Sequence, residues 1–134
     1  MKIYVFDATA LFAFLQNKLG AAKVSELLNE AMRGRAAMFI SAVNFEEVYG
    51  AVLRAHGSDR AQAVLSAVHS MPVNIADATR QRALDAAGTK LKYKLYYADS
   101  FAAALAIELK ASLVTSDSDF RHLGHSFPIV WLKV

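Results

Sequence analysis

The stretch KIYVFD, residues 2–7, decides the fold that the sequence predicts. Residues 3–6 form a short apolar run that favours a strand buried on both faces, as in a parallel sheet. The run stops at Asp7, and a helical pattern begins at once in residues 9–16. A carboxylate at the end of a buried strand either caps the following helix or has a chemical role. The sequence leaves both interpretations of Asp7 open.

The rest of the chain alternates predicted strands with predicted helices. Strands are expected at residues 38–40, 72–75, 112–115 and 129–132, and helices at residues 21–32, 43–55, 59–69, 78–87 and 98–109. Residues 116–120 are expected to turn into a short helix that runs through residue 123. The expected caps of three of these helices are Ser41, Ser58 or Asp59, and Asp77. This order is typical of an α/β sandwich with a central parallel sheet of about five strands. We expect residues 1–134 to form a single domain.

Composition limits the class of protein. The chain has 134 residues, of which 55% are hydrophobic, and it has no cysteine, which excludes disulfides and thiolate metal sites. No apolar run approaches the roughly eighteen residues of a membrane span, and Asp7 lies too early for the apolar region of a signal peptide. We therefore expect a cytoplasmic protein with no membrane partner. A net charge of +3 does not by itself predict a nucleic-acid partner.

Half of the acidic residues follow predicted strands or open the helices beside them. They are Asp7, Glu46, Glu47, Asp99, Asp117 and Asp119. Most of them are expected at the carboxyl ends of the strands, where ligands of open α/β sheets bind. Clustered carboxylates repel one another, so a fold retains them when cations fill the cluster, and oxygen ligands suit Mg²⁺ or Mn²⁺. Such ions activate water and stabilise the leaving oxygen in phosphodiester hydrolysis.

Each carboxylate also has a purely structural explanation. Asp99 suits the first turn of a helix, where the helix dipole favours an acid. Residues 116–119 (SDSD) are ordinary turn residues, and at least one of Glu46 and Glu47 is expected to be a solvated charge on a helix. Only the joint placement of the carboxylates favours a metal site.

Four segments together resemble PIN domains. They are residues 7–11 (DATAL), residues 41–48 (SAVNFEEV), residues 99–106 (DSFAAALA) and residues 113–120 (LVTSDSDF), and they occur in the order of the family. In the second segment a glutamate follows the serine by six residues, which selects Glu47 over Glu46. The resemblance runs from residue 3 to residue 131. The length and the single-domain organisation are similar to those of the VapC-type toxins of prokaryotic toxin–antitoxin pairs.

The resemblance implies a three-layer α/β/α fold and an endoribonuclease that depends on Mg²⁺ or Mn²⁺. It also implies a homodimer, and a small cognate antitoxin that occludes the acidic pocket or inserts into it. The implied metal ligands are Asp7, Glu47, Asp99 and Asp117, with Asp119 as an accessory ligand or supporting acid. Thr9 and Thr115 match positions whose hydroxyls hold an acid or a water. Ala8 and Asn44 stand where threonine is frequent in the family, and neither belongs to the acidic set.

Residues 89–96, which alternate lysine with apolar residues, are expected to form a loop. An acidic pocket with basic surroundings suits a polyanion such as RNA. The candidate RNA-binding residues of this segment are Lys90, Lys92, Tyr93 and Lys94, and Tyr96 or Tyr97 offers a second ring that could stack on a base. The alternative is a solvated basic loop whose tyrosines pack inward.

Functions other than RNA cleavage require sequence features that can be compared with this chain. A phosphotransferase of the haloacid-dehalogenase type needs a second aspartate where Thr9 stands, and a receiver-like domain needs an acidic pair after the first strand. A Rossmann nucleotide-binding domain needs a glycine-rich first turn, which residues 7–9 lack. The remaining alternative is a catalytically silent PIN-like module that binds RNA or a protein.

Overall fold

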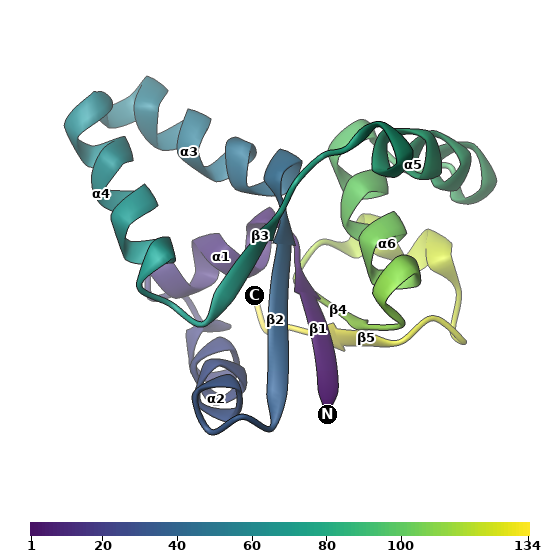
Figure 1. Ribbon diagram of the computed structural model, residues 1–134, viewed down its shortest axis with the longest axis horizontal. Coiled ribbons are helices and arrows are strands. Elements are labelled where there is room, and N and C mark those ends of the chain that lie inside the picture. The colour runs from purple at the N-terminus through teal and green to yellow at the C-terminus, as the bar shows by residue number, and fades with distance from the viewer.

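The computed structural model describes residues 1–134 and contains five strands, six α-helices and one 3₁₀-helix (Figure 1). The elements follow in the order β1 (Lys2–Phe6), α1 (Ala8–Leu15), α2 (Ala21–Met32), β2 (Ala36–Ser41), α3 (Ala42–His56), α4 (Ser58–His69), β3 (Val73–Ala76), α5 (Arg80–Tyr93), α6 (Tyr97–Leu109), β4 (Ser112–Thr115), η1 (Ser118–Leu123) and β5 (Ile129–Trp131). No helix combines the length and the apolar character that crossing a membrane requires.

All five strands are parallel and lie in the order β3-β2-β1-β4-β5. The first strand of the chain is therefore the central strand, and its Phe6 pairs with Ile40 of β2 on one side and Val114 of β4 on the other. Helices α1, α2 and α4 lie on one side of the sheet, and α5 and α6 lie on the other (Figure 1). The predicted three-layer sandwich with five parallel strands is confirmed.

Strand β1 contributes to both hydrophobic cores. Phe6 belongs to the core under α1, α2 and α4, whereas Val5 belongs to the core under α6 and η1, and both are fully buried. Successive side chains of a strand point to opposite faces, so a strand between two helical layers needs apolar residues at every position. A shift of one residue would exchange the two faces, so burial on both sides fixes the register that places Asp7 at the end of β1.

The predicted loop at residues 89–96 is wrong for residues 89–93, because α5 continues through Gly88 to Tyr93, and only residues 94–96 connect it to α6. A glycine inside a helix costs only about 1 kcal/mol relative to alanine, and the residues after Gly88 include good helix formers. Tyr93, in the added turn, packs against the core under α6, which supports the longer helix. The helix ends at Lys94, which adopts the left-handed conformation with φ 57°.

Two of the predicted helix caps are also wrong, whereas Ser41 caps α3 as expected. Thr79, rather than Asp77, caps α5, since its hydroxyl accepts a hydrogen bond from the Arg82 N–H at 3.2 Å. Helix α4 begins at Ser58 with Gly57 at its cap position and has no side-chain cap. Gly57 has φ 89°, a conformation that glycine adopts without strain, and this allows α3 and α4 to follow each other directly.

Candidate active site

Asp7 is buried at the carboxyl end of β1, with 3% of its surface exposed. Its Oδ1 accepts hydrogen bonds from the Ala10 N–H at 3.0 Å and from the Thr9 hydroxyl at 2.7 Å. Its Oδ2 accepts a hydrogen bond from the Thr115 hydroxyl at 2.5 Å. Asp7 therefore caps α1 and also bonds to the end of β4, so a capping role does not remove it from the acidic site.

The hydroxyls of Thr9 and Thr115 join the end of β1 to the segment after β4. Thr115 Oγ1 lies 3.2 Å from Thr9 Oγ1 and accepts a hydrogen bond from the Asp117 N–H at 2.9 Å. Thr9 Oγ1 accepts a hydrogen bond from the Ser116 N–H, also at 2.9 Å. These bonds hold the backbone of residues 116–117 against Asp7 and so determine where the Asp117 side chain lies.

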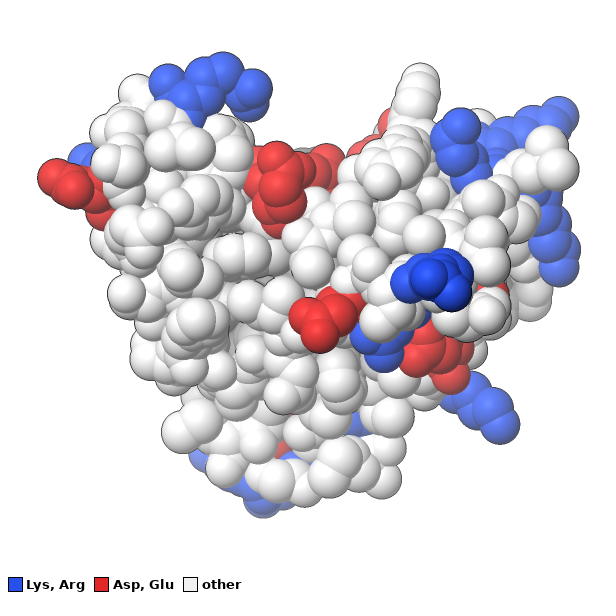
Figure 2. Space-filling view, turned by 45° about the horizontal axis from the view of Figure 1, so that its top comes forward, with Lys and Arg blue, Asp and Glu red and all other residues white.

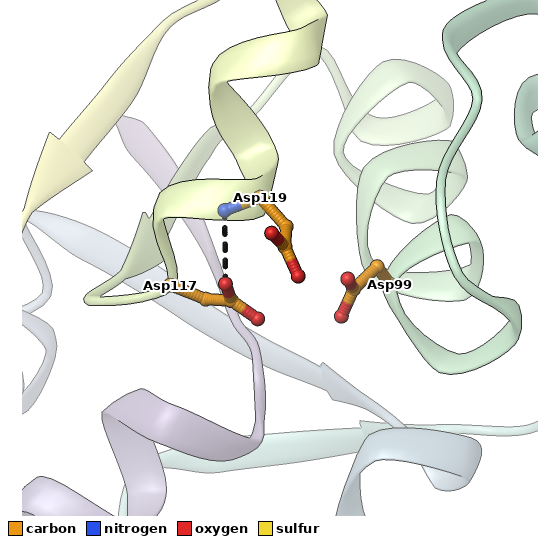
Figure 3. Close-up of side chains that lie close together, drawn as sticks. All are labelled: Asp99, Asp117 and Asp119. Atoms are coloured by element: carbon orange, nitrogen blue, oxygen red, sulfur yellow. Dashed lines mark hydrogen bonds between the residues drawn. The ribbon is translucent and has the colours of Figure 1, made fainter.

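Asp99, Asp117 and Asp119 form a compact group of carboxylates, with one oxygen from each lying within 4.8 Å of the others. Figure 3 shows the three side chains directed toward one another, Asp99 from the first turn of α6 and the other two from the start of η1. Asp117 Oδ1 accepts a hydrogen bond from the Asp119 N–H at 2.9 Å and thereby caps η1. Asp117, like Asp7, therefore serves both as a helix cap and as a residue of the acidic site.

Burial raises the pKa of Asp99 to about 7, together with smaller contributions from the charges of Asp117, Asp7, Glu47 and Asp119, in that order of size. Its Oδ2 is buried and has no hydrogen-bond partner. Burial also raises the pKa of Asp7 to about 6, although the hydrogen bonds from Thr115, Thr9 and Ala10 oppose the shift. Leaving a buried acceptor unsatisfied costs roughly 1–3 kcal/mol, and more when the group is charged.

A divalent cation fits this group of residues. It would give the free Asp99 oxygen a partner and offset the repulsion among the carboxylates, and ligation by carboxylate oxygens alone suits Mg²⁺ or Mn²⁺ rather than zinc.

Glu47 approaches the other carboxylates from α3. Partial burial raises its pKa, the hydrogen bond from Asn44 opposes the shift, and the charges of Glu46 and Asp117 add to it. The carboxylate of Glu46 instead lies over Gly50, where a Cβ atom would come within 3.0 Å of its Oε1. This geometry favours Glu47 over Glu46. Glu47 is nevertheless outside the compact group that Asp99, Asp117 and Asp119 form.

Asn44 is a residue of the site that the sequence prediction left out. It is 1% exposed, and its Nδ2 donates hydrogen bonds to Glu47 Oε1 at 3.1 Å and to the Ala98 carbonyl at 3.0 Å. One amide therefore orients Glu47 and holds α3 against the residue that precedes Asp99. The available signal was the spacing, since residues three apart on a helix lie on one face. In the sequence, Asn44 stood out only because it occupies a position where threonine is frequent in PIN domains.

The basic residues of the predicted RNA-binding segment lie at the end of α5 rather than in a loop. Tyr93 packs against the core under α6, and Lys92 Nζ lies 5.1 Å from the centre of its ring. Tyr96 and Tyr97, at the start of α6, are 71% and 64% exposed. Figure 2 shows acidic side chains on the walls of a notch between two lobes, and basic side chains gathered on the outer side of the lobe that carries α5.

Residues 4–126 match the family model described as PIN domain. The chain belongs to the PIN-domain family. No curated protein matches the chain in sequence. The family assignment thus agrees with the resemblance seen in the four sequence segments.

Solved structures share this fold. VapBC2 from Rickettsia felis, bound to a DNA fragment from its promoter, matches with a TM-score of 0.76 and 17% identity, over 98% of this chain and 99% of that chain. The DNA-bound VapBC from Salmonella typhimurium matches with a TM-score of 0.72 and 16% identity, over 97% and 98%. VapC20 from Mycobacterium tuberculosis, a toxin that cleaves the sarcin–ricin loop, matches with a TM-score of 0.69 and 16% identity, over 92% and 95%. At these identities the likeness shows the PIN-domain fold.

Proposed function

We propose that this PIN domain is an endoribonuclease that depends on Mg²⁺ or Mn²⁺ and hydrolyses RNA phosphodiester bonds, as the toxin of a toxin–antitoxin pair. The observation that carries the proposal is the buried Asp99 Oδ2, which has no hydrogen-bond partner and belongs to the carboxylate grouped with those of Asp117 and Asp119. Support also comes from the fold, which is shared with VapBC complexes and with a toxin that cleaves the sarcin–ricin loop.

In this proposal the cation is held by Asp7, Glu47, Asp99 and Asp117, with Asp119 as an accessory ligand. The cation supplies Lewis-acid stabilisation of the charge that develops on the scissile phosphate. The hydroxyls of Thr9 and Thr115 donate hydrogen bonds to Asp7, which favours its ionised form despite burial. Asn44, which lies on the same helix α3, holds the Glu47 side chain by a hydrogen bond.

The test is cleavage of end-labelled RNA, both single-stranded and structured, with Mg²⁺, with Mn²⁺ or with EDTA. Cleavage is expected only with the metal ions, and Asp99→Asn is expected to lower the rate by at least about 100-fold, the usual effect of removing one group that stabilises transition-state charge. Equal cleavage in EDTA contradicts the metal mechanism. Folded protein that binds RNA but cleaves none of the substrates supports instead the catalytically silent binding module.

Glu47→Gln is expected to lower the cleavage rate by about 10- to 100-fold, whereas Glu46→Gln leaves the rate within a few-fold of the parent. The two variants are a matched pair, because they make the same chemical change at adjacent positions of α3. The physical reason is that Glu47 lies near the charge of Asp117 and is held by Asn44, whereas the Glu46 carboxylate lies over Gly50. Initial rates at saturating Mn²⁺ provide the measurement, and a larger loss in Glu46→Gln reverses the assignment.

We further propose a small antitoxin and a second copy of this chain as protein partners. The antitoxin is supported by the VapBC complexes that share the fold. A short open reading frame directly upstream, whose product co-purifies with this chain and suppresses cleavage, is the expected finding. Sedimentation of the isolated chain tests the homodimer, and a monomer at micromolar concentration contradicts it.

A further inference from the structure

Trp131 ends the edge strand β5, one strand away from the acidic site. It pairs with Thr115, and the Leu132 N–H donates a hydrogen bond to the Thr115 carbonyl at 2.8 Å. Thr115 is the residue whose hydroxyl bonds to Asp7. Since neighbouring strands lie about 4.8 Å apart, the backbone of Trp131 is close to the carboxylates. The chain has a single tryptophan, and this one is 45% exposed.

Two hollows of the surface meet at the Trp131 side chain. One has a volume of about 530 Å³ and is also lined by Arg121 and His125. The other has a volume of about 350 Å³ and is also lined by Leu19 and Lys133. The Arg121 guanidinium lies 6.0 Å from the centre of the indole ring. An exposed indole beside a cation, with open space next to it, is suited to stacking on a planar ligand.

A third hollow extends this surface to Thr9 and Ser116, which lie beside the acidic site. It has a volume of about 640 Å³ and is lined by Thr9 and Ser116 as well as by Leu19 and Lys133, which it shares with the second hollow. Because neighbouring hollows share lining residues, the three together form a path along the surface from Thr9, whose hydroxyl donates to Asp7, to Trp131.

The charge along this path is positive. Lys18, Arg121 and Lys133 line the hollows and have no carboxylate oxygen within 4.0 Å. Lys23 is paired with Glu26, the one acidic residue among the lining residues of these hollows, at 3.4 Å. Unpaired cations favour a polyanion, and they disfavour the same face of a second copy because like charges would meet.

We propose that Trp131 stacks on a nucleobase of single-stranded RNA, while Arg121 and Lys133 bind the phosphates on either side of that base. The inference rests on the proposed function and adds a substrate-binding subsite to it. The base would lie beyond the scissile phosphodiester, on the β5 side of the acidic site. The stretch of RNA between the two would follow the hollow that contains Thr9 and Ser116.

Trp131 itself provides the readout, because it is the single tryptophan of the chain and the tryptophan emission therefore comes from this residue alone. In EDTA, where the RNA stays intact, titration with a single-stranded oligonucleotide is expected to quench the emission. The quenching is expected to saturate at the same RNA concentration as the anisotropy of an end-labelled copy. A blunt RNA duplex, whose bases are already stacked, is expected to leave the emission unchanged.

Three variants complete the test. Trp131→Leu is expected to weaken RNA binding by about tenfold and to raise KM with little change in kcat, whereas Trp131→Phe keeps most of the affinity. Arg121→Gln is expected to lower the salt dependence of binding by about one counterion. Thermal unfolding confirms that each variant is folded.

The outcomes separate this inference from the proposed function. RNA that binds by anisotropy without changing the tryptophan emission overturns the subsite, even if cleavage occurs. Unchanged affinity in Trp131→Leu does the same. Emission that depends on protein concentration without RNA assigns the indole to a contact between copies and also overturns the subsite. Quenching by RNA without cleavage in Mn²⁺ supports the subsite and contradicts the nuclease proposal.

Discussion

Asp7→Asn is expected to abolish RNA cleavage while leaving the metal-free protein at least as stable as the parent. An asparagine keeps an oxygen for the Ala10 N–H, and its amide can donate to the Thr115 hydroxyl, which then donates to Thr9. Asparagine is as good a helix cap as aspartate. The substitution removes a buried charge whose desolvation raises the pKa of Asp7 to about 6. The measurements are the cleavage rate in Mn²⁺, expected to fall at least about 100-fold, and the thermal midpoint in EDTA at pH 8.

Asp7→Ala is the control for this prediction. It removes the cap of α1, which costs about 1 kcal/mol, and it leaves two buried hydroxyls without their acceptor. Asp7→Ala is therefore expected to unfold at a lower temperature than Asp7→Asn in EDTA. If Asp7→Asn is as unstable as Asp7→Ala, the charge of Asp7 serves the fold, and the account of it as a metal ligand fails.

The metal-free protein is expected to become less stable, relative to Asp99→Asn, as the pH rises from about 4 to about 7. The pKa of Asp7 is about 6 and that of Asp99 about 7 in the folded protein, against 3.8 for an ordinary aspartate. In this window the folded state holds protons that the unfolded state releases, so the contribution of these groups to stability falls as the pH increases. Asp7 is present in both proteins, so the difference between them reports mainly the raised pKa of Asp99.

Urea unfolding of the parent and of Asp99→Asn, in EDTA at pH 4.5 and at pH 7.5, measures this effect. The difference in unfolding free energy is expected to favour the variant at pH 7.5 and to shrink at pH 4.5, and carboxylates outside the site cancel in the comparison. Adding Mn²⁺ at pH 7.5 is expected to stabilise the parent more than the variant. A difference that does not change with pH contradicts the strained acidic cluster.

The central part of the fold could be predicted because local pattern and burial agree. Residues 3–6 are apolar at every position, and the structure places them in the middle of the sheet with Val5 and Phe6 in opposite cores. Asp7 and Asp117 then follow from the strand ends. Their roles as helix caps were considered an alternative to a chemical role. The structure shows that Asp117 caps η1 and still lies in the group with Asp99 and Asp119. Asp7 caps α1 and is close enough for its charge to raise the pKa of Asp99.

The remaining features depend on contacts that a single sequence does not contain. Gly88 looked like a helix terminator, but the packing of Tyr93 against the core under α6 favours a longer helix. The two hydrogen bonds of Asn44 require α3 and α6 to be adjacent, so only its spacing to Glu47 could have been noticed. The unpartnered oxygen of Asp99 is likewise a property of the assembled site.

Calorimetric titration of Mn²⁺ into the parent and into Asp99→Asn at pH 6.5 tests most directly whether the acidic cluster is a metal site. The parent is expected to show saturable binding. It is also expected to release protons, seen as a heat that depends on the buffer, because the raised pKa values of Asp7 and Asp99 leave protons that the metal displaces. Asp99→Asn is expected to bind at least about tenfold more weakly. Absence of saturable binding in the parent, or equal binding in Asp99→Asn, contradicts the account.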